Sequence, residues 1–355
     1  MTYKVIGLMS GSSLDGLDIA YVHLTEQRGA WSFELKAADC IPYSAVWIDA
    51  LKAVPDLTLA GVASMNATYG EYIGACVNTF IEQHGLHYAV DFISSHGHTC
   101  LHEPAGRATF QLGNGAAIAA ATGISTITDL RAMDVALGGQ GAPIVPIGDM
   151  LLFPGYDAWL NLGGIANITL KTADSLIAFD ICACNQILNA LASRAGKDFD
   201  DGGAMAREGG LLPDLLHRLN AHSYLAQPFP KSLSNKDAWD MGRPALRDKT
   251  LATEDLLHTY SQHIAQQIGA AIADNGPVKL LVTGGGALNK FLMDSIRKAL
   301  PGIEVIVPAS DIIQYKEAIV MALIGALRWR GEVNVLASVT GASRDSSGGA
   351  IWAGA

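Results

Sequence analysis

Both halves of the 355-residue chain open in the same way, with an apolar strand, a turn of small residues and a second strand. These strands are expected at 3–9 and 17–24 in the first half, and at 159–162 and 167–170 in the second. Apolar residues also recur at helical spacing at 69–81, 257–272 and 319–327. Strands and helices are therefore mixed in both halves, which predicts an α/β chain. The shared opening suggests an internal duplication, although the halves have negligible sequence identity.

Composition excludes several classes of protein. Half of the residues are hydrophobic and 16% are charged, which rules out a disordered chain. The formal net charge is −10 and no basic run is present, which argues against a partner that is a nucleic acid or an anionic membrane. We read no signal peptide and no apolar run long enough for a membrane span. The five cysteines are sparse and odd in number, which fits a cytoplasmic protein.

The strongest local signal is residues 7–18 (GLMSGSSLDGLD), which run from the end of the first strand to the start of the second. Its glycines, Gly11 and Gly16, permit positive φ, and its consecutive amides and serine hydroxyls can form an anion-binding nest. Asp15 and Asp18 are candidates to hold Mg²⁺ through water. An ordinary hairpin is the alternative, because Gly, Ser and Asp are common in turns.

Two more glycine turns follow apolar strands, at 161–167 and at 283–287. The second leads into a helix, where a ligand can approach both the backbone and the helix N-terminus. Three such turns together indicate a nucleotide site more specifically than any one of them. The usual fingerprints of P-loop, dinucleotide-binding and protein-kinase folds are missing. We therefore expect a nucleotide to bind in a cleft between two α/β halves.

Taken in order, these turns resemble those of the anhydro-N-acetylmuramic acid kinases, a family of the sugar kinase, heat-shock ATPase and actin superfamily. The resemblance runs nearly end to end and rests on 7–18, 95–99 with 102–104, 129–131 with Asp134, 138–143, 161–167, 179–180 with Asn185, 284–286 with Asn289, Glu317 and 339–342. It implies a two-domain actin-like ATPase fold, a duplicated ribonuclease H-like fold with an interdomain cleft. Domain I is expected at 1–135 plus 335–355 and domain II at 136–334, with a hinge near the glycine-rich segment 138–143.

The same resemblance implies an ATP-dependent kinase of cell-wall recycling. Such an enzyme hydrolytically opens 1,6-anhydro-N-acetylmuramic acid and phosphorylates it to N-acetylmuramic acid 6-phosphate, with ATP and Mg²⁺ bound. The residues implied for ATP are Gly11, Ser12, Ser13, Leu14, Asp15, Gly16, Leu17, Asp18, Asn161, Gly163, Gly164, Gly284, Gly285 and Gly286, with Asp15 also near Mg²⁺. The residues implied for the sugar are His96, His98, Arg131, Asp134, Gly139 and Glu317. The resemblance leaves open whether the protein forms a homodimer.

Asp180 is the candidate general base. We expect it to end the apolar strand at 176–179, where a carboxylate can take a proton from a bound water. The alternative is that Asp180 caps a helix beginning at Ile181. After Asp180, residues 198–250 are polar and rich in turns, without strong periodicity.

The chain departs from the family pattern at two places. Residues 181–185 (ICACN) replace a Gly-Pro-Gly-Asn-like loop, and His98 stands where Gln is usual. Three alternatives to the implied function stay open. They are a related amino-sugar kinase of the same fold, a non-catalytic sugar sensor, which the altered loop after Asp180 suggests, and a zinc hydrolase that uses His96, His98 and His102, which the His-x-His pattern suggests.

Overall fold

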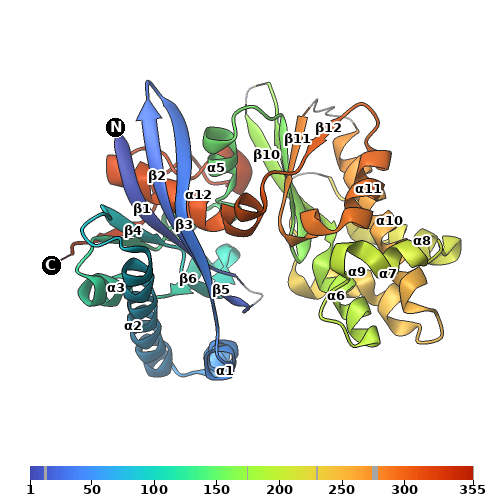
Figure 1. Ribbon diagram of the computed structural model, residues 1–355, viewed down its shortest axis with the longest axis horizontal. Coiled ribbons are helices and arrows are strands. Elements are labelled where there is room, and N and C mark those ends of the chain that lie inside the picture. The colour runs from blue at the N-terminus through green and yellow to red at the C-terminus, as the bar shows by residue number, and fades with distance from the viewer. Residues whose placement is uncertain (12–13, 174, 229–230, 274–278, 355) are drawn as a thin grey trace. The chain divides into compact units, whose positions relative to one another are not determined.

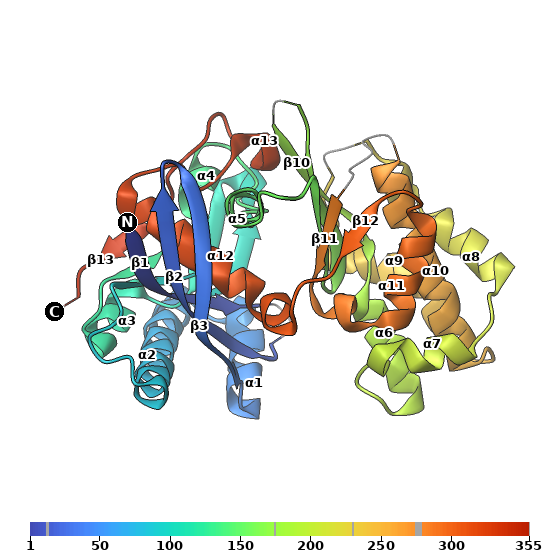
Figure 2. The same ribbon diagram turned by 45° about the horizontal axis from the view of Figure 1, so that its top comes forward.

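The computed structural model of the chain describes residues 1–11, 14–173, 175–228, 231–273 and 279–354. The chain divides into two compact units, unit 1 with Met1–Pro154 and Tyr315–Ala355, and unit 2 with Gly155–Gln314 (Figures 1 and 2). Each unit has its own main β-sheet and its own hydrophobic core. None of the helices in the described ranges has both the length and the apolar character that crossing a bilayer requires.

In unit 1 the main sheet has the strand order β13-β7-β4-β1-β2-β3. These strands are β1 (Thr2–Ser10), β2 (Gly16–Gln27), β3 (Ala30–Pro42), β4 (Phe92–Ser95), β7 (Thr126–Thr128) and β13 (Ala350–Trp352). Strands β1, β2 and β3 are antiparallel neighbours, whereas β1, β4 and β7 run parallel. A separate hairpin consists of β5 (His98–Glu103) and β6 (Ala108–Leu112).

One face of this sheet is covered by α2 (Leu59–His84). The helix begins where Thr58 Oγ1 accepts a hydrogen bond from the Gly61 amide, and it ends at Gly85, whose φ of 63° suits glycine. Its buried stripe packs on the sheet side chains of the same core, with Tyr69, Ile73, Val77 and Phe80 meeting Ile6, Leu8, Ile19 and Ile93. The helical spacing and the glycine stop at this position were both predicted, and both are confirmed.

Helix α12 (Ser310–Arg330) covers the opposite face of the sheet. Figures 1 and 2 show this late segment, in red, among the blue strands of unit 1. At Gly7 of β1 a Cβ atom would lie 2.0 Å from the Ala318 carbonyl oxygen, so only glycine allows this close approach. The other helices of unit 1 are α1 (Ala45–Ala53), α3 (Gly115–Thr122), α4 (Ala132–Ala136), α5 (Pro146–Leu152) and α13 (Ala337–Thr340), with 3₁₀ turns at Val54–Asp56 and Pro104–Gly106.

In unit 2 the sheet has the strand order β10-β9-β8-β11-β12. These strands are β8 (Ala158–Leu162), β9 (Ile165–Lys171), β10 (Leu176–Ala183), β11 (Lys279–Thr283) and β12 (Glu304–Ile306). The helices are α6 (Asn185–Ala192), α7 (Ala204–Glu208), α8 (Pro213–Asn220), α9 (Asn235–Arg247), α10 (Thr253–Ile272) and α11 (Lys290–Ala299). Short 3₁₀ turns lie at Ser193–Ala195, Asp201–Gly203, Ser223–Ala226 and Gly285–Leu288.

The two sheets share one topology. Numbered within each unit, the common strands lie in the order third, second, first, fourth and fifth: β3-β2-β1-β4-β7 in unit 1 and β10-β9-β8-β11-β12 in unit 2. In both, the first three strands are antiparallel and the first, fourth and fifth are parallel. This repeated order confirms the expected duplicated α/β fold, although the two halves share negligible sequence identity.

The division between the units differs from the expected domain boundaries. It falls at 154/155 and 314/315, instead of at 135/136 and 334/335. Helix α5 stays with unit 1 because the ring of Phe153 packs on Phe33 of β3, with centroids 5.5 Å apart. Lys316 of α12 also forms a buried ion pair with Asp149 of α5, at 2.6 Å. The segment 138–143 lies inside unit 1, so it is not the boundary.

Residues 198–250, expected to be irregular, include helices α7, α8 and α9. In α9 the buried residues are Ala238, Met241, Gly242 and Ala245, mostly small side chains that give little apolar signal. In α8 only Leu215 and Leu219 are buried. The helical period was missed because tertiary packing, more than local apolar content, stabilises these short helices.

Candidate functional site

The loop between β1 and β2 is described at Gly11 and from Leu14 onward, and the predicted ATP residues Ser12 and Ser13 lie outside the described residues. Leu14 has positive φ (57°), and Asp15 Oδ1 accepts a hydrogen bond from the Gly16 amide at 3.0 Å. Gly16 is not at positive φ. Glycine is needed there because a Cβ atom would lie 2.6 Å from the Ile41 carbonyl oxygen of β3.

Three carboxylates and one guanidinium of unit 1 interact electrostatically next to this loop. The pKa of Asp18 is raised to about 6, mainly by burial and also by the charges of Asp15 and Glu317, while a hydrogen bond with Cys40 acts against this rise. Burial also raises the pKa of Glu317, while the nearby charges of Lys316 and Arg131 lower it. Predicted phosphate and sugar residues from β2, α12 and the loop after β7 therefore lie near one another.

Arg131 and His96 are hydrogen-bond partners. The Arg131 Nε–H donates to His96 Nε2 at 2.8 Å, and His96 Nδ1 lies 2.9 Å from the Gly97 carbonyl oxygen. The ring therefore carries its proton on Nδ1. Burial, helped by the charge of Arg131, lowers the pKa of His96 to about 3, so the ring is neutral. His96 orients the guanidinium of Arg131.

Asp134 organises the glycine-rich segment after α4. Its Oδ2 accepts from the Gly141 amide at 2.7 Å, and its Oδ1 accepts from Thr340 Oγ1 at 2.7 Å. A Cβ atom at Gly139 would lie 2.2 Å from Asp134 Oδ2, so Gly139 lets the segment fold over this carboxylate. Both residues thus hold the backbone of 139–141 in place.

In unit 2 the structure brings together the two predicted glycine turns. At Gly284, which has φ of 80°, a Cβ atom would lie 2.4 Å from Asn161 Oδ1, so this turn packs directly on the end of β8. The Asn185 side chain donates to the Leu162 carbonyl oxygen at 2.8 Å, and the Asn185 amide donates to Gly163 at 3.1 Å. The first turn of α6 is therefore tied to the turn at 161–167.

Asp180 lies within β10 and does not end the strand, which continues to Ala183 with a register shift between Asp180 and Cys182. Helix α6 begins only at Asn185, so the alternative that Asp180 caps a helix at Ile181 is wrong. The strand continues because Ile181, Cys182 and Ala183 are all buried.

The Asp180 carboxylate is held by a segment from far along the chain. Its Oδ2 accepts from the Leu233 amide at 2.8 Å and from Ser232 Oγ at 3.3 Å, and among the described residues Oδ1 has no hydrogen-bond partner. The Tyr224 hydroxyl donates to the Asp180 carbonyl oxygen at 2.8 Å. Burial raises the pKa of Asp180, and the two hydrogen bonds lower it. One carboxylate oxygen is thus fixed and the other is available.

Residues 224, 232 and 233 were not predicted as site residues, because nothing in their local sequence marks them. Thr340, which holds Asp134, lies within the segment 339–342 that contributed to the family resemblance, so that segment was the available signal.

Each of the three histidines named for a zinc site has another hydrogen-bond partner. His98 Nδ1 lies 3.0 Å from Ser10 Oγ, and His102 Nδ1 lies 3.1 Å from Thr109 Oγ1. In the described part of the chain, no group of three His, Cys, Asp or Glu side chains is arranged to hold a metal ion. The geometry therefore does not favour the zinc hydrolase alternative. A magnesium ion near Asp15 would be held by this carboxylate together with other ligands.

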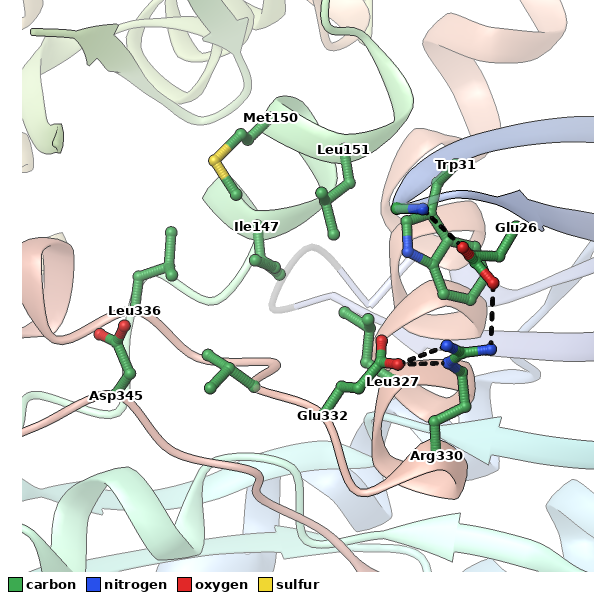
Figure 3. Close-up of a pocket in the computed structure, with 12 residues that line it drawn as sticks. Glu26, Trp31, Ile147, Met150, Leu151, Leu327, Arg330, Glu332, Leu336 and Asp345 are labelled. Carbon is green, nitrogen blue, oxygen red and sulfur yellow. Dashed lines mark hydrogen bonds and ion pairs between the residues drawn. The ribbon is translucent and has the colours of Figure 1, made fainter. Parts of the chain in front are cut away.

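A hollow of about 390 Å³ lies elsewhere in unit 1 and contains none of the predicted site residues. Figure 3 shows Ile147, Met150 and Leu151 of α5 facing it, with Arg330 between Glu26 and Glu332. Arg330 is paired with Glu26 at 3.3 Å and with Glu332 at 2.5 Å. Its charge is therefore neutralised, and the hollow offers no free cation to an anionic ligand.

Comparison with known proteins gives a match over the whole chain. The family model described as "Anhydro-N-acetylmuramic acid kinase" matches residues 3–354. The chain is 33% identical to the protein of that name from Sulfurovum sp. (strain NBC37-1), over 98% of this chain and 99% of the relative. It is 35% identical to the one from Streptomyces coelicolor, over 99% and 94%.

Among solved structures, the activator of 2-hydroxyisocaproyl-CoA dehydratase from Clostridium difficile with bound ADPNP aligns over 91% of this chain and 93% of that one. The TM-score is 0.45 and the identity 14%, which is too low to bear on function. The full-length family match and the identity to curated relatives decide the assignment: the chain belongs to the anhydro-N-acetylmuramic acid kinase family.

Proposed function

We propose that this chain is an ATP-dependent kinase that opens 1,6-anhydro-N-acetylmuramic acid with water and phosphorylates it to N-acetylmuramic acid 6-phosphate, as part of cell-wall recycling. Membership of the kinase family supports the activity. The observation that carries the mechanism is the environment of Asp180, with one oxygen held by Leu233 and Ser232 and the other available.

In this mechanism Asp180 accepts a proton from the water that attacks the anomeric carbon of the sugar. The bond between that carbon and the bridging oxygen breaks, and this oxygen takes the γ-phosphoryl group of ATP. ADP and the 6-phosphate leave, and the proton on Asp180 passes to solvent. The hydrogen bonds to Oδ2 orient the carboxylate, and they also favour its ionised form, which a base requires.

We assign the ATP phosphates to the loop Gly11–Asp18 and to the turn containing Asn161, Gly163 and Gly164, and the adenosine to Gly284–Gly286. The support in unit 2 is the packing of the last two turns against each other. Magnesium, bound near Asp15 through water, would neutralise phosphate charge. Within loop 11–18, Gly16 contributes by allowing the backbone to pack closely against β3.

For the sugar we assign direct contacts to Arg131, Glu317 and His98. His96 orients Arg131, and Asp134 with Gly139 holds the backbone of residues 139–141. A neutral His96 and a charged Arg131 suit a polar ligand that carries a carboxylate, because guanidinium binds carboxylates in a bidentate way. We expect ATP and sugar to meet in a cleft between the two domains.

The substitution Asp180→Asn tests the base directly. The amide oxygen still accepts from the Leu233 amide, so the free energy of unfolding should change by less than about 1 kcal/mol. The proton acceptor is lost, so we expect kcat to fall roughly 100- to 10,000-fold, with ATP and sugar binding retained. Turnover is followed by ADP release, binding by calorimetry and folding by thermal melting.

Asp157→Asn is the matched control, because Asp157 Oδ2 also accepts a backbone amide, from Lys279 at 3.0 Å, and is remote from the proposed chemistry. Native kcat in a folded Asp180→Asn protein contradicts the mechanism. A panel of anhydro and reducing amino sugars separates a related sugar kinase from the proposed one. A sugar sensor would bind sugar and release no ADP.

A further inference from the structure

Four side chains beneath the opening loop of unit 1 form a continuous chain of hydrogen bonds. Tyr69 lies on α2, Tyr43 between β3 and α1, Ser10 at the end of β1, and His98 at the start of β5. The two tyrosine hydroxyls are 2.5 Å apart, Tyr43 Oη is 2.8 Å from Ser10 Oγ, and Ser10 Oγ is 3.0 Å from His98 Nδ1. All four residues are buried, at 0–7% exposure.

The direction of each bond follows from the number of protons available. Tyr43 has one hydroxyl proton and donates it to Ser10, so it accepts from Tyr69. The Ser10 hydroxyl is itself buried and needs an acceptor. Both the Tyr69 hydroxyl and His98 Nδ1 interact with it, and we infer that Ser10 donates to His98 Nδ1, at 3.0 Å. A ring nitrogen that accepts a hydrogen bond carries no proton, so the neutral imidazole has its proton on Nε2.

The groups in this chain keep fixed protonation states near neutral pH. Burial lowers the pKa of His98, so the ring is neutral. Burial also raises the pKa of Tyr69 to about 12 and raises that of Tyr43 further, so both phenols keep their protons. The direction of the chain therefore does not reverse with small changes in pH.

We propose that Tyr69, Tyr43 and Ser10 form a relay that fixes His98 in the Nε2–H tautomer and so makes its ring a hydrogen-bond donor to an oxygen of the bound sugar. Ser10 and the tyrosines are positioning residues, because they act through His98. His96, two residues away, has the opposite tautomer because Arg131 donates to its Nε2. The neighbouring histidines thus differ in what they offer a ligand. The donor role rests on the proposed function, whereas the tautomer does not.

The tautomer is read directly from the ¹⁵N chemical shifts of histidine-labelled protein, with the His98 signals assigned by their loss in His98→Gln. We expect a protonated Nε2 and an unprotonated Nδ1 in the wild-type protein. Ser10→Ala removes the donor to Nδ1, so its ¹⁵N shift should move and the ring should become a tautomer mixture. Tyr43→Phe, which removes the hydroxyl that orders Ser10, should move the shift in the same direction.

Tyr72→Phe is the matched control, because the Tyr72 ring packs against Tyr43 at 6.1 Å and its hydroxyl is outside the relay. It should leave the His98 shifts unchanged. A proton on Nδ1 in the wild-type protein, or unchanged shifts in a folded Ser10→Ala protein, would overturn the proposal.

Kinetics test the donor role. Tyr43→Phe should raise KM for the anhydro sugar roughly two- to tenfold, with little change in kcat, because it weakens one hydrogen bond to the bound sugar. In the His98→Gln background it should add nothing further, because an amide carries its donor without the relay. Additive effects, or an unchanged KM beside a changed tautomer, would overturn the donor role. A chain inactive on every sugar contradicts the proposed function instead, while the ¹⁵N shifts still decide the tautomer.

Discussion

The position and environment of the Asp180 carboxylate are set by residues more than 40 positions away along the chain. Tyr224 holds its backbone, and Ser232 and Leu233 hold one of its side-chain oxygens. The burial that raises its pKa is opposed by these hydrogen bonds, which stabilise the charged form. The protonation state of the proposed base therefore depends on the segment 231–233 as well as on Asp180.

Ser232→Ala tests this balance at a single residue. Loss of a hydrogen bond to the carboxylate raises the pKa of Asp180, since the ionised form loses a donor. The base acts only when ionised, so the acidic limb of the kcat profile should move to higher pH, while kcat on the plateau stays near native. Lys231 and Tyr224, the other titratable groups packed nearby, are unchanged in this variant.

Ser232→Thr keeps the hydroxyl and serves as the control, with an acidic limb close to that of the wild-type enzyme. An acidic limb at the same pH in the alanine and threonine variants would show that Ser232 does not set the pKa of Asp180.

At the scale of elements, strand β1 of unit 1 is packed between helices α2 and α12, and α12 lies closer to its backbone than α2 does. Large side chains separate β1 from α2, whereas α12 approaches the backbone at Gly7 directly. The Ser94 hydroxyl on the adjacent strand also donates to the Met321 carbonyl oxygen of α12 at 2.6 Å. This close packing fixes the helix that carries Glu317.

Gly7→Ala is expected to destabilise unit 1, because the added methyl group overlaps the Ala318 backbone and neither β1 nor α12 can move without disturbing the core. We expect the free energy of unfolding to fall by about 1–3 kcal/mol. Denaturant titration measures it.

Gly106→Ala is the control in the same unit, since its Cβ atom meets nothing within 4 Å and its φ is not positive. Equal stability of the two variants would contradict the close packing of α12 on β1.

At the scale of the whole molecule, two units with the same sheet topology are joined by two crossings of the chain, at 154/155 and 314/315. If ATP and sugar bind between the domains, the ligands should draw them together, as in other enzymes that exclude water by domain closure. We expect the radius of gyration from small-angle scattering to fall when the anhydro sugar and a nonhydrolysable ATP analogue are both present.

Each ligand alone, and a reducing sugar that is not phosphorylated, are the controls for closure. Identical scattering profiles with and without both ligands would count against domain closure, and would leave the proposed chemistry of Asp180 to be tested separately.

Sequence patterns predicted the elements that local periodicity encodes. The buried stripe of α2 with its stop at Gly85, the paired strands β1 and β2, and the apolar strand β11 all agree with the expectation. The alternation of β3 was missed because its residues are mostly half-exposed, and α9 was missed because its buried face is made of small residues.

The sequence by itself determined the α/β class, the three glycine turns and the family resemblance, because each depends on residue types at short, fixed spacings. Only the tertiary structure decided how those residues are used. Asp134 binds Thr340, 206 positions away, and Asp180 binds Leu233, 53 positions away. The number and direction of hydrogen bonds to a buried polar group depend on which segments pack beside it, and local spacing does not specify that packing.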